Sequence, residues 1–106
     1  MDAQDVRSAP VEAEAYMRAV ASEYADRVDR WVSDLPALPE VWDQSATLSD
    51  FRLRLRPDEA AELLAELESV VARYRRDEPD TERPEGAERV ILQVQLMPFL
   101  MAGPVA

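Results

Sequence analysis

The chain has 106 residues, no Cys and no His, and 22 acidic residues against 12 basic ones, giving a formal charge of −10. Without thiolate or imidazole groups it lacks the usual ligands of soft metals and the usual nucleophile and base pairs, so we expect no catalytic residue, no metal site and no cofactor. The acidic balance opposes attraction to a phosphate backbone, so we expect no direct nucleic-acid contact by this chain.

The length fits one domain over residues 1–106, because a chain of this size buries somewhat over ~60% of its unfolded surface. Residues 1–7 are expected to be a flexible N-terminus, and residues 99–106 a tail. No apolar run approaches the ~20 residues of a membrane span, and no signal-peptide pattern opens the chain. We therefore expect no membrane partner and a cytoplasmic location.

A long amphipathic helix is predicted over residues 8–35. Ser8 is a suitable N-cap, Pro10 is tolerated in the first turn, and Pro36 and Pro39 stop the helix. Apolar side chains recur close to every 3.6 residues and form one stripe on this helix: Met17, Val20, Tyr24, Val28 and Trp31. Because so small a domain cannot cover this stripe alone, we expect it to be buried between the subunits of a homodimer.

After a linker over residues 36–45, a strand–helix–strand block is predicted over residues 46–98. From Phe51 to Arg56 apolar and basic residues alternate strictly, as in a half-buried strand. Pro57 then opens a helix whose apolar face extends to Tyr74. A second alternating strand starts near Glu88 and stops at Pro98.

The predicted fold class is therefore α+β. The short turn at Pro57 sends the helix back along the first strand, so the second strand is most simply parallel to the first. Two parallel strands under one helix make a poor sheet in isolation. We expect dimerisation to complete the sheet.

This pattern resembles a known regulator family. Leu53-Arg54-Leu55-Arg56-Pro57-Asp58-Glu59, the later Tyr74-Arg75-Arg76, an acidic Pro-rich loop and a strand closing at Pro98 are similar to the C-terminal domain of actinobacterial winged-helix regulators of the ArsR type. Arg56 and Asp58 replace the Thr and first Glu of the family's helix start, which removes a side-chain cap. The resemblance implies a dimerisation or effector-sensing domain.

The DNA-binding module of such regulators is missing from this chain. A winged helix needs roughly 60–80 residues with a basic recognition helix, and no segment here fits. The resemblance therefore implies that a winged-helix module is supplied in cis or as a neighbour. We expect it to be held by the homodimer at a fixed spacing.

A candidate effector or anion contact combines basic and aromatic side chains: Arg52, Arg54, Arg56, Trp31 and Trp42. The alternative is that exposed arginines pair with acidic residues and discourage edge aggregation, and that the tryptophans pack in a core. The acidic loop after the helix lacks the ordered spacing of a calcium loop and is expected to be solvated.

Three functions fit these observations. The leading one is a non-catalytic dimerisation or effector-sensing domain of a transcriptional regulator. The first alternative is a free-standing acidic protein-interaction module that binds a basic surface. The second is a small dimeric ligand-binding α+β protein, a reading supported by fold analogy alone.

Overall fold

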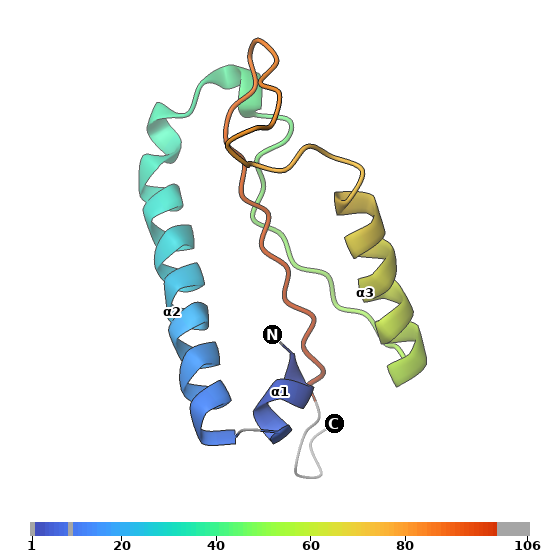
Figure 1. Ribbon diagram of the computed structural model, residues 1–106. Helices are drawn as coiled ribbons and strands as arrows, with labels where there is room; N and C mark the ends of the chain where they lie inside the picture. The colour runs from blue at the N-terminus through green and yellow to red at the C-terminus, as the bar shows by residue number, and fades with distance from the viewer. Residues whose placement is uncertain (1, 9, 100–106) are drawn as a thin grey trace. The chain divides into compact units, whose positions relative to one another are not determined.

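The computed structural model describes residues 2–8 and 10–99 and contains three α-helices and two short 3₁₀ turns in that part of the chain (Figure 1). The helices are α1 (Ala3–Ser8), α2 (Pro10–Asp34) and α3 (Pro57–Val71). The turns are η1 (Leu35–Ala37) and η2 (Glu40–Trp42). The chain divides into two compact units, Met1–Ser49 and Asp50–Ala106.

Helix α1 occupies most of the segment that the sequence predicted to be flexible. The carboxylate of Asp2 accepts a hydrogen bond from the backbone N–H of Gln4 at 2.9 Å, which satisfies one of the free donors at the start of the helix. Ser8 ends α1 and donates its hydroxyl to the carbonyl of Gln4 at 3.0 Å. Ser8 therefore does not have the N-cap role predicted for it.

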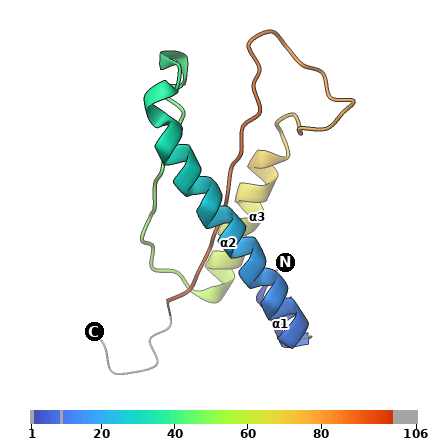
Figure 2. The same cartoon turned by 90° about the vertical axis from the view of Figure 1, so that its left-hand side faces the viewer.

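The long helix predicted over residues 8–35 is confirmed as α2, which has 25 residues (Figure 2). Its exposed surface carries ion pairs one turn apart, Glu14 with Arg18 at 2.8 Å and Glu23 with Arg27 at 3.2 Å. Such pairs add only a few tenths of a kcal/mol each. Helix α1 packs against α2, and Ala13 there is buried, with 9% of its surface exposed.

The predicted linker over residues 36–45 contains tight turns. η1 directly follows α2, and the N–H of Leu38 bonds the carbonyl of Leu35 at 3.0 Å. η2 follows Pro39 and is extended by bonds from Ser45 and Ala46 to the carbonyl of Trp42. The prolines at 36 and 39 thus end the α-helical pattern as the sequence indicated.

Helix α3 begins at Pro57 as predicted, but its last residue is Val71. The chain makes one tighter turn after it, with the N–H groups of Arg73 and Tyr74 bonding the carbonyls of Val70 and Val71. The basic residues Arg73, Arg75 and Arg76 therefore follow the helix and do not lie in its last turn. The sequence pattern placed Tyr74 on the apolar face of this helix. In the structure Tyr74 follows the helix and is 71% exposed.

The α+β prediction is wrong: residues 2–8 and 10–99 contain helices and no β-strand. Residues 51–56 and 88–98 lack regular secondary structure, and Figure 2 draws them as a plain trace without arrows. Phe51 and Leu53, predicted to point into a core, are 84% and 61% exposed. Alternation favours an extended backbone, but a strand also needs a partner, and two short parallel segments offer each other the weaker kind of pairing.

The loop between α3 and residue 88 is ordered by local contacts. The guanidinium of Arg89 lies 2.7 Å from the carboxylate of Asp77 and joins the two ends of the loop. Near its end, the N–H of Ala87 bonds the carbonyl of Pro84 across Gly86, whose φ is +83°. A residue with a Cβ is strained at that angle, so the turn favours Gly.

Little apolar surface is buried anywhere in the described part of the chain. Among residues 2–4, 7, 8 and 11–99, whose side-chain burial is described, Ala13 is the one buried hydrophobic residue, and no polar or charged residue is buried. No helix within residues 2–8 and 10–99 has the length and apolar character needed to cross a membrane. The predicted tail lies outside the described residues except for Phe99.

Candidate association surfaces

The apolar stripe of the long helix, called the α2 stripe from here on, lies on one face of α2, and its five side chains are half-buried: Met17, Val20, Tyr24, Val28 and Trp31. Part of the cover on Tyr24 comes from its own helix, because the guanidinium of Arg27 lies 5.5 Å from the centre of the Tyr24 ring. That geometry suits a cation–π contact. The burial of this stripe between the subunits of a homodimer stays a prediction.

Of the three arginines in the candidate contact, Arg52, Arg54 and Arg56, two form ion pairs with carboxylates close to them in the sequence. Arg52 lies 3.7 Å from Asp50, and Arg56 contacts both Asp58 and Glu59. Arg54 has no ion pair within the described residues. Two of the three side chains thus follow the alternative considered from the sequence, pairing with acidic neighbours, rather than forming a ladder of unpaired cations.

Arg56 is the N-cap residue of α3 and organises the start of this helix. Its backbone N–H donates to the carboxylate of Glu59 at 2.9 Å, and its guanidinium donates to both carboxylate oxygens of Asp58 at 3.1 and 3.4 Å. The hydrogen bond from Arg56 lowers the pKa of Asp58 below its ordinary value of 3.8. Negative charge is thereby kept at the positive end of the helix dipole.

The two tryptophans of the candidate effector contact are both half-buried in the first unit. Trp31 belongs to the last turns of α2, and Trp42 ends η2. The three arginines belong to the second unit. The candidate contact would draw on both units, so it stays a prediction.

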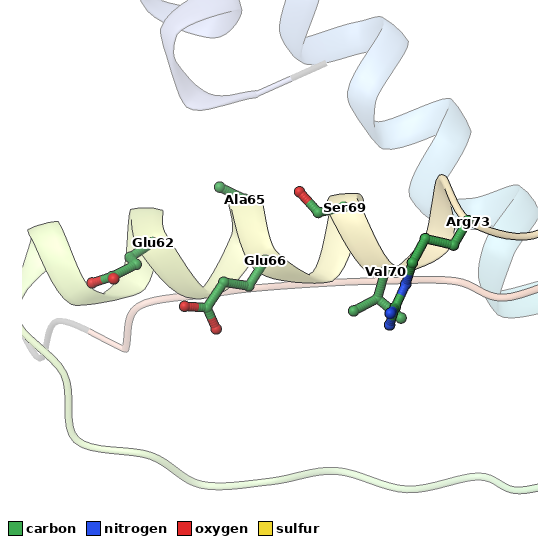
Figure 3. Close-up of a pocket in the computed structure, with 6 residues that line it drawn as sticks. All are labelled: Glu62, Ala65, Glu66, Ser69, Val70 and Arg73. Atoms are coloured by element: carbon green, nitrogen blue, oxygen red, sulfur yellow. The ribbon is translucent and has the colours of Figure 1, made fainter.

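One side of α3 carries an open hollow, shown in Figure 3. Its lining combines acidic, small and basic side chains along the helix: Glu62, Ala65, Glu66, Ser69, Val70 and Arg73. Glu66, Val70 and Arg73 point to the same side in Figure 3. All the lining residues are exposed, so the hollow is a surface feature and lacks the enclosure typical of small-molecule pockets.

No group of three or more acidic side chains within residues 2–8 and 10–99 is close enough to hold a metal ion. In the acidic loop, Asp77 is instead paired with Arg89. This pair joins residues twelve positions apart across a loop, so no local pattern in the sequence predicts it. The Asp2 cap of α1 was also not predicted, although an Asp directly before a helix is a typical N-cap signal.

Comparisons with known proteins add no further restriction on the function. A scan against family models, a search of curated proteins and a search of solved structures each found no match. The functional argument therefore depends on the chemistry and exposure of the chain's own residues.

Proposed function

We propose that this chain is a non-catalytic association module, whose apolar helix faces are covered by another polypeptide. The supporting observation is that, among residues 2–4, 7, 8 and 11–99, for which the structure describes side-chain burial, Ala13 is the one buried hydrophobic residue. Fixing each backbone residue costs about 1–2 kcal/mol, whereas burying one large apolar side chain returns about 1.5–3 kcal/mol. Without such burial the helices lack the main term that stabilises a fold.

The two longer helices provide the surfaces for this association. The α2 stripe is half-buried, while Leu64, Leu67 and Val70 of α3 remain 38%, 38% and 42% exposed. A helix of 15 residues such as α3 is marginal in water by itself, so packing of its apolar face is needed to stabilise it. Covering both faces would add several large apolar contacts.

The biological role that we propose for this module is dimerisation or effector sensing in a transcriptional regulator. A winged-helix module, in cis or as a neighbour, would then supply the DNA contacts that a charge of −10 disfavours here. The support for this narrower role is the sequence pattern around α3 and the long helix before it. The strand–helix–strand arrangement no longer supports it.

The acidic charge favours a second candidate, binding to a basic surface of another protein. Opposite charges speed encounter and favour specific partners, and the effect falls as salt rises. The two candidates differ in the kind of partner: the first is satisfied by apolar burial in any salt, and the second requires a cationic protein.

Hydrogen–deuterium exchange at several protein concentrations tests the association proposal. We expect backbone amides of α2 and α3 to exchange rapidly at high dilution and to become protected as concentration rises or a partner is added, because association stabilises the folded form by mass action. Strong protection of both helices that does not change on dilution, in a chain of monomeric mass, would show a self-sufficient fold and contradict the proposal.

A further inference from the structure

The α2 stripe has a spacing that is the same in both directions along the helix. From Met17 to Trp31 its members follow at intervals of three, four, four and three residues, so the intervals are symmetric about Tyr24. Met17 and Val28 are eleven residues apart, a repeat close to the natural turn of an α-helix. The stripe therefore stays on one side of α2, which is a single continuous helix in Figure 1.

A second copy of α2 that runs in the opposite direction matches this stripe in register. When the two Tyr24 side chains face each other, Met17 lies opposite Trp31 of the other copy, because both are equally distant from Tyr24. Val20 lies opposite Val28 for the same reason. All five members of the stripe then meet another member of the stripe.

The same register fits the ends of the helix. Asp34, the last residue of α2, lies opposite residue 14, so the two helices overlap over residues 14–34, a contact about 30 Å long. Ala13 lies just outside this overlap, and it is already buried where α1 packs against α2. Helix α1 therefore covers a part of the face that the second copy leaves open.

An ion pair flanks the centre of the stripe. Glu23 and Arg27 lie 3.2 Å apart within one chain, and at ~100° per residue they stand about 100° and 60° around the helix from Tyr24, on the same side. Side chains at such positions flank the seam of paired helices and reach across it. The guanidinium of Arg27 lies 5.5 Å from the centre of the Tyr24 ring, so it is directed towards the seam.

The antiparallel register brings these flanking charges of the two copies together. Each flank faces the same flank of the other copy, with Glu23 displaced by only about 3 Å along the axis from Arg27 of the other chain. Two-fold symmetry forms this contact twice and joins the four groups in a ring of alternating sign. One Arg27 can serve two carboxylates, because a guanidinium has five N–H donors.

Parallel packing lacks this complementarity. It would place the flank of Glu23 and Arg27 against the opposite flank of the other helix, where Ala21 and Ala25 stand near the same heights and offer no charge. It would also set Trp31 against Trp31, whereas the antiparallel register sets large side chains against smaller ones, which interdigitate better. Charge and size therefore favour the same direction.

We propose that the partner covering α2 is a second copy of this chain, packed antiparallel with Tyr24 at the two-fold axis. This inference rests on the proposed association function and adds the identity of the partner, its direction and its register. The apolar side chains stabilise the contact, since each one covered removes surface from water. The charges select the direction, because opposite charges facing each other are favourable.

Disulfide cross-linking tests the direction and the register, because the chain has no Cys and each introduced thiol is then the only one. Chains with Val20→Cys and chains with Val28→Cys are prepared separately, mixed under reducing conditions and oxidised at a concentration where the wild-type chain is dimeric. We expect the mixture to form a covalent dimer that neither variant forms readily alone. In the antiparallel register each thiol lies about 12 Å along the axis from its own copy, too far for a disulfide.

Peptide mapping identifies the cross-link. Trypsin cleaves after Arg18, Arg27 and Arg30, so the two introduced thiols lie in different peptides and mass spectrometry distinguishes the mixed disulfide from the two symmetric ones. Parallel packing would instead cross-link each variant with itself. Circular dichroism of each variant checks that the helices are retained.

Charge reversal tests the ion pairs between the copies. Glu23→Arg should weaken the dimer about five- to tenfold in sedimentation equilibrium, because like charges replace two opposite-charge contacts. Adding Arg27→Glu exchanges the two signs and should return the Kd to within about threefold of the wild-type value. Glu14→Arg is the matched control, since it also loses an ion pair one turn away, with Arg18 at 2.8 Å, but faces Val32 of the other copy. It should leave the Kd within about twofold.

The outcomes separate this inference from the association proposal. A wild-type dimer whose single-cysteine chains cross-link with themselves as readily as with each other would overturn the antiparallel register and leave association intact. Equal weakening by Glu23→Arg and Glu14→Arg would overturn the ion pairs as the choice of direction. A wild-type monomer with unprotected helices would overturn the second copy as partner and leave another protein as the occupant of α2. A monomer with concentration-independent protection would overturn both proposals.

Discussion

The guanidinium of Arg56 donates two hydrogen bonds, of 3.1 and 3.4 Å, to the carboxylate of Asp58 at the first turn of α3. The same residue donates its backbone N–H to Glu59. An arginine that the sequence placed at the end of a strand, as a candidate anion contact, thus acts at the start of a helix. Charge and hydrogen bonding both favour helix initiation at this point.

Removing the Glu59 carboxylate should weaken the start of α3. Glu59→Ala leaves the N–H of Arg56 without its acceptor, and we expect a loss of about 0.5–2 kcal/mol in the stability of the helix, as for other cap removals. Hydrogen exchange of the first turns of α3 provides the measurement. Glu62→Ala, three residues further along α3 and without an ion pair in the described part of the chain, is the control, and an equal loss there would argue against a capping role for Glu59.

Acid should loosen the same turn through Asp58. Its pKa is lowered in the folded chain, so its contribution to stability is present above the ordinary value of 3.8 and is lost as the pH falls through the lower folded-state pKa. We expect helicity followed by circular dichroism to fall in that range. Asp58→Asn should remove this part of the pH dependence, and an unchanged acid transition in that variant would show that other carboxyls control it.

Val28→Asp tests the α2 stripe. Val28 is half-buried on α2, and placing a carboxylate beneath a partner chain should weaken association and stability by several kcal/mol, because the desolvation of a charge is not repaid there. Sedimentation and urea unfolding give the two measurements. Ser22→Asp, at an exposed position of the same helix, is the control. Wild-type mass and stability in Val28→Asp would remove the stripe from the interface.

The isolated chain should show no measurable affinity for duplex DNA at physiological salt. Its charge of −10 opposes the phosphate backbone, and no helix of the described residues presents a basic face. Gel shifts with random duplexes are the simplest check. Binding that weakens steeply with rising salt would reveal a basic patch that outweighs the net charge.

The helices were predictable because their signals are local. The 3.6-residue stripe, Pro57 and the acidic first turn of α3 each act within a few residues, and the structure has both long helices close to the expected bounds. The strands were not predictable from the same kind of signal. Alternation around Leu53 describes which side chains share a face, but a sheet requires hydrogen bonds to residues distant in sequence, and α3 separates the two segments.

The candidate sites show the same division. Arg56 pairs with Asp58 and Glu59, which are close to it in the sequence. The alternative that exposed arginines pair with acidic residues predicted this kind of contact. The association of Trp31 and Trp42 with the arginines depends on the relation between distant parts of the chain, which no pattern in the sequence fixes.

Sedimentation equilibrium of the purified wild-type chain, measured from nanomolar to high micromolar concentration together with exchange protection, tests the central claim most directly. We expect the mass to rise from that of one chain to that of two, and protection of α2 and α3 to rise over the same concentration range. A monomer at every concentration, with both helices protected throughout, would contradict the claim that another chain covers the apolar faces of this protein.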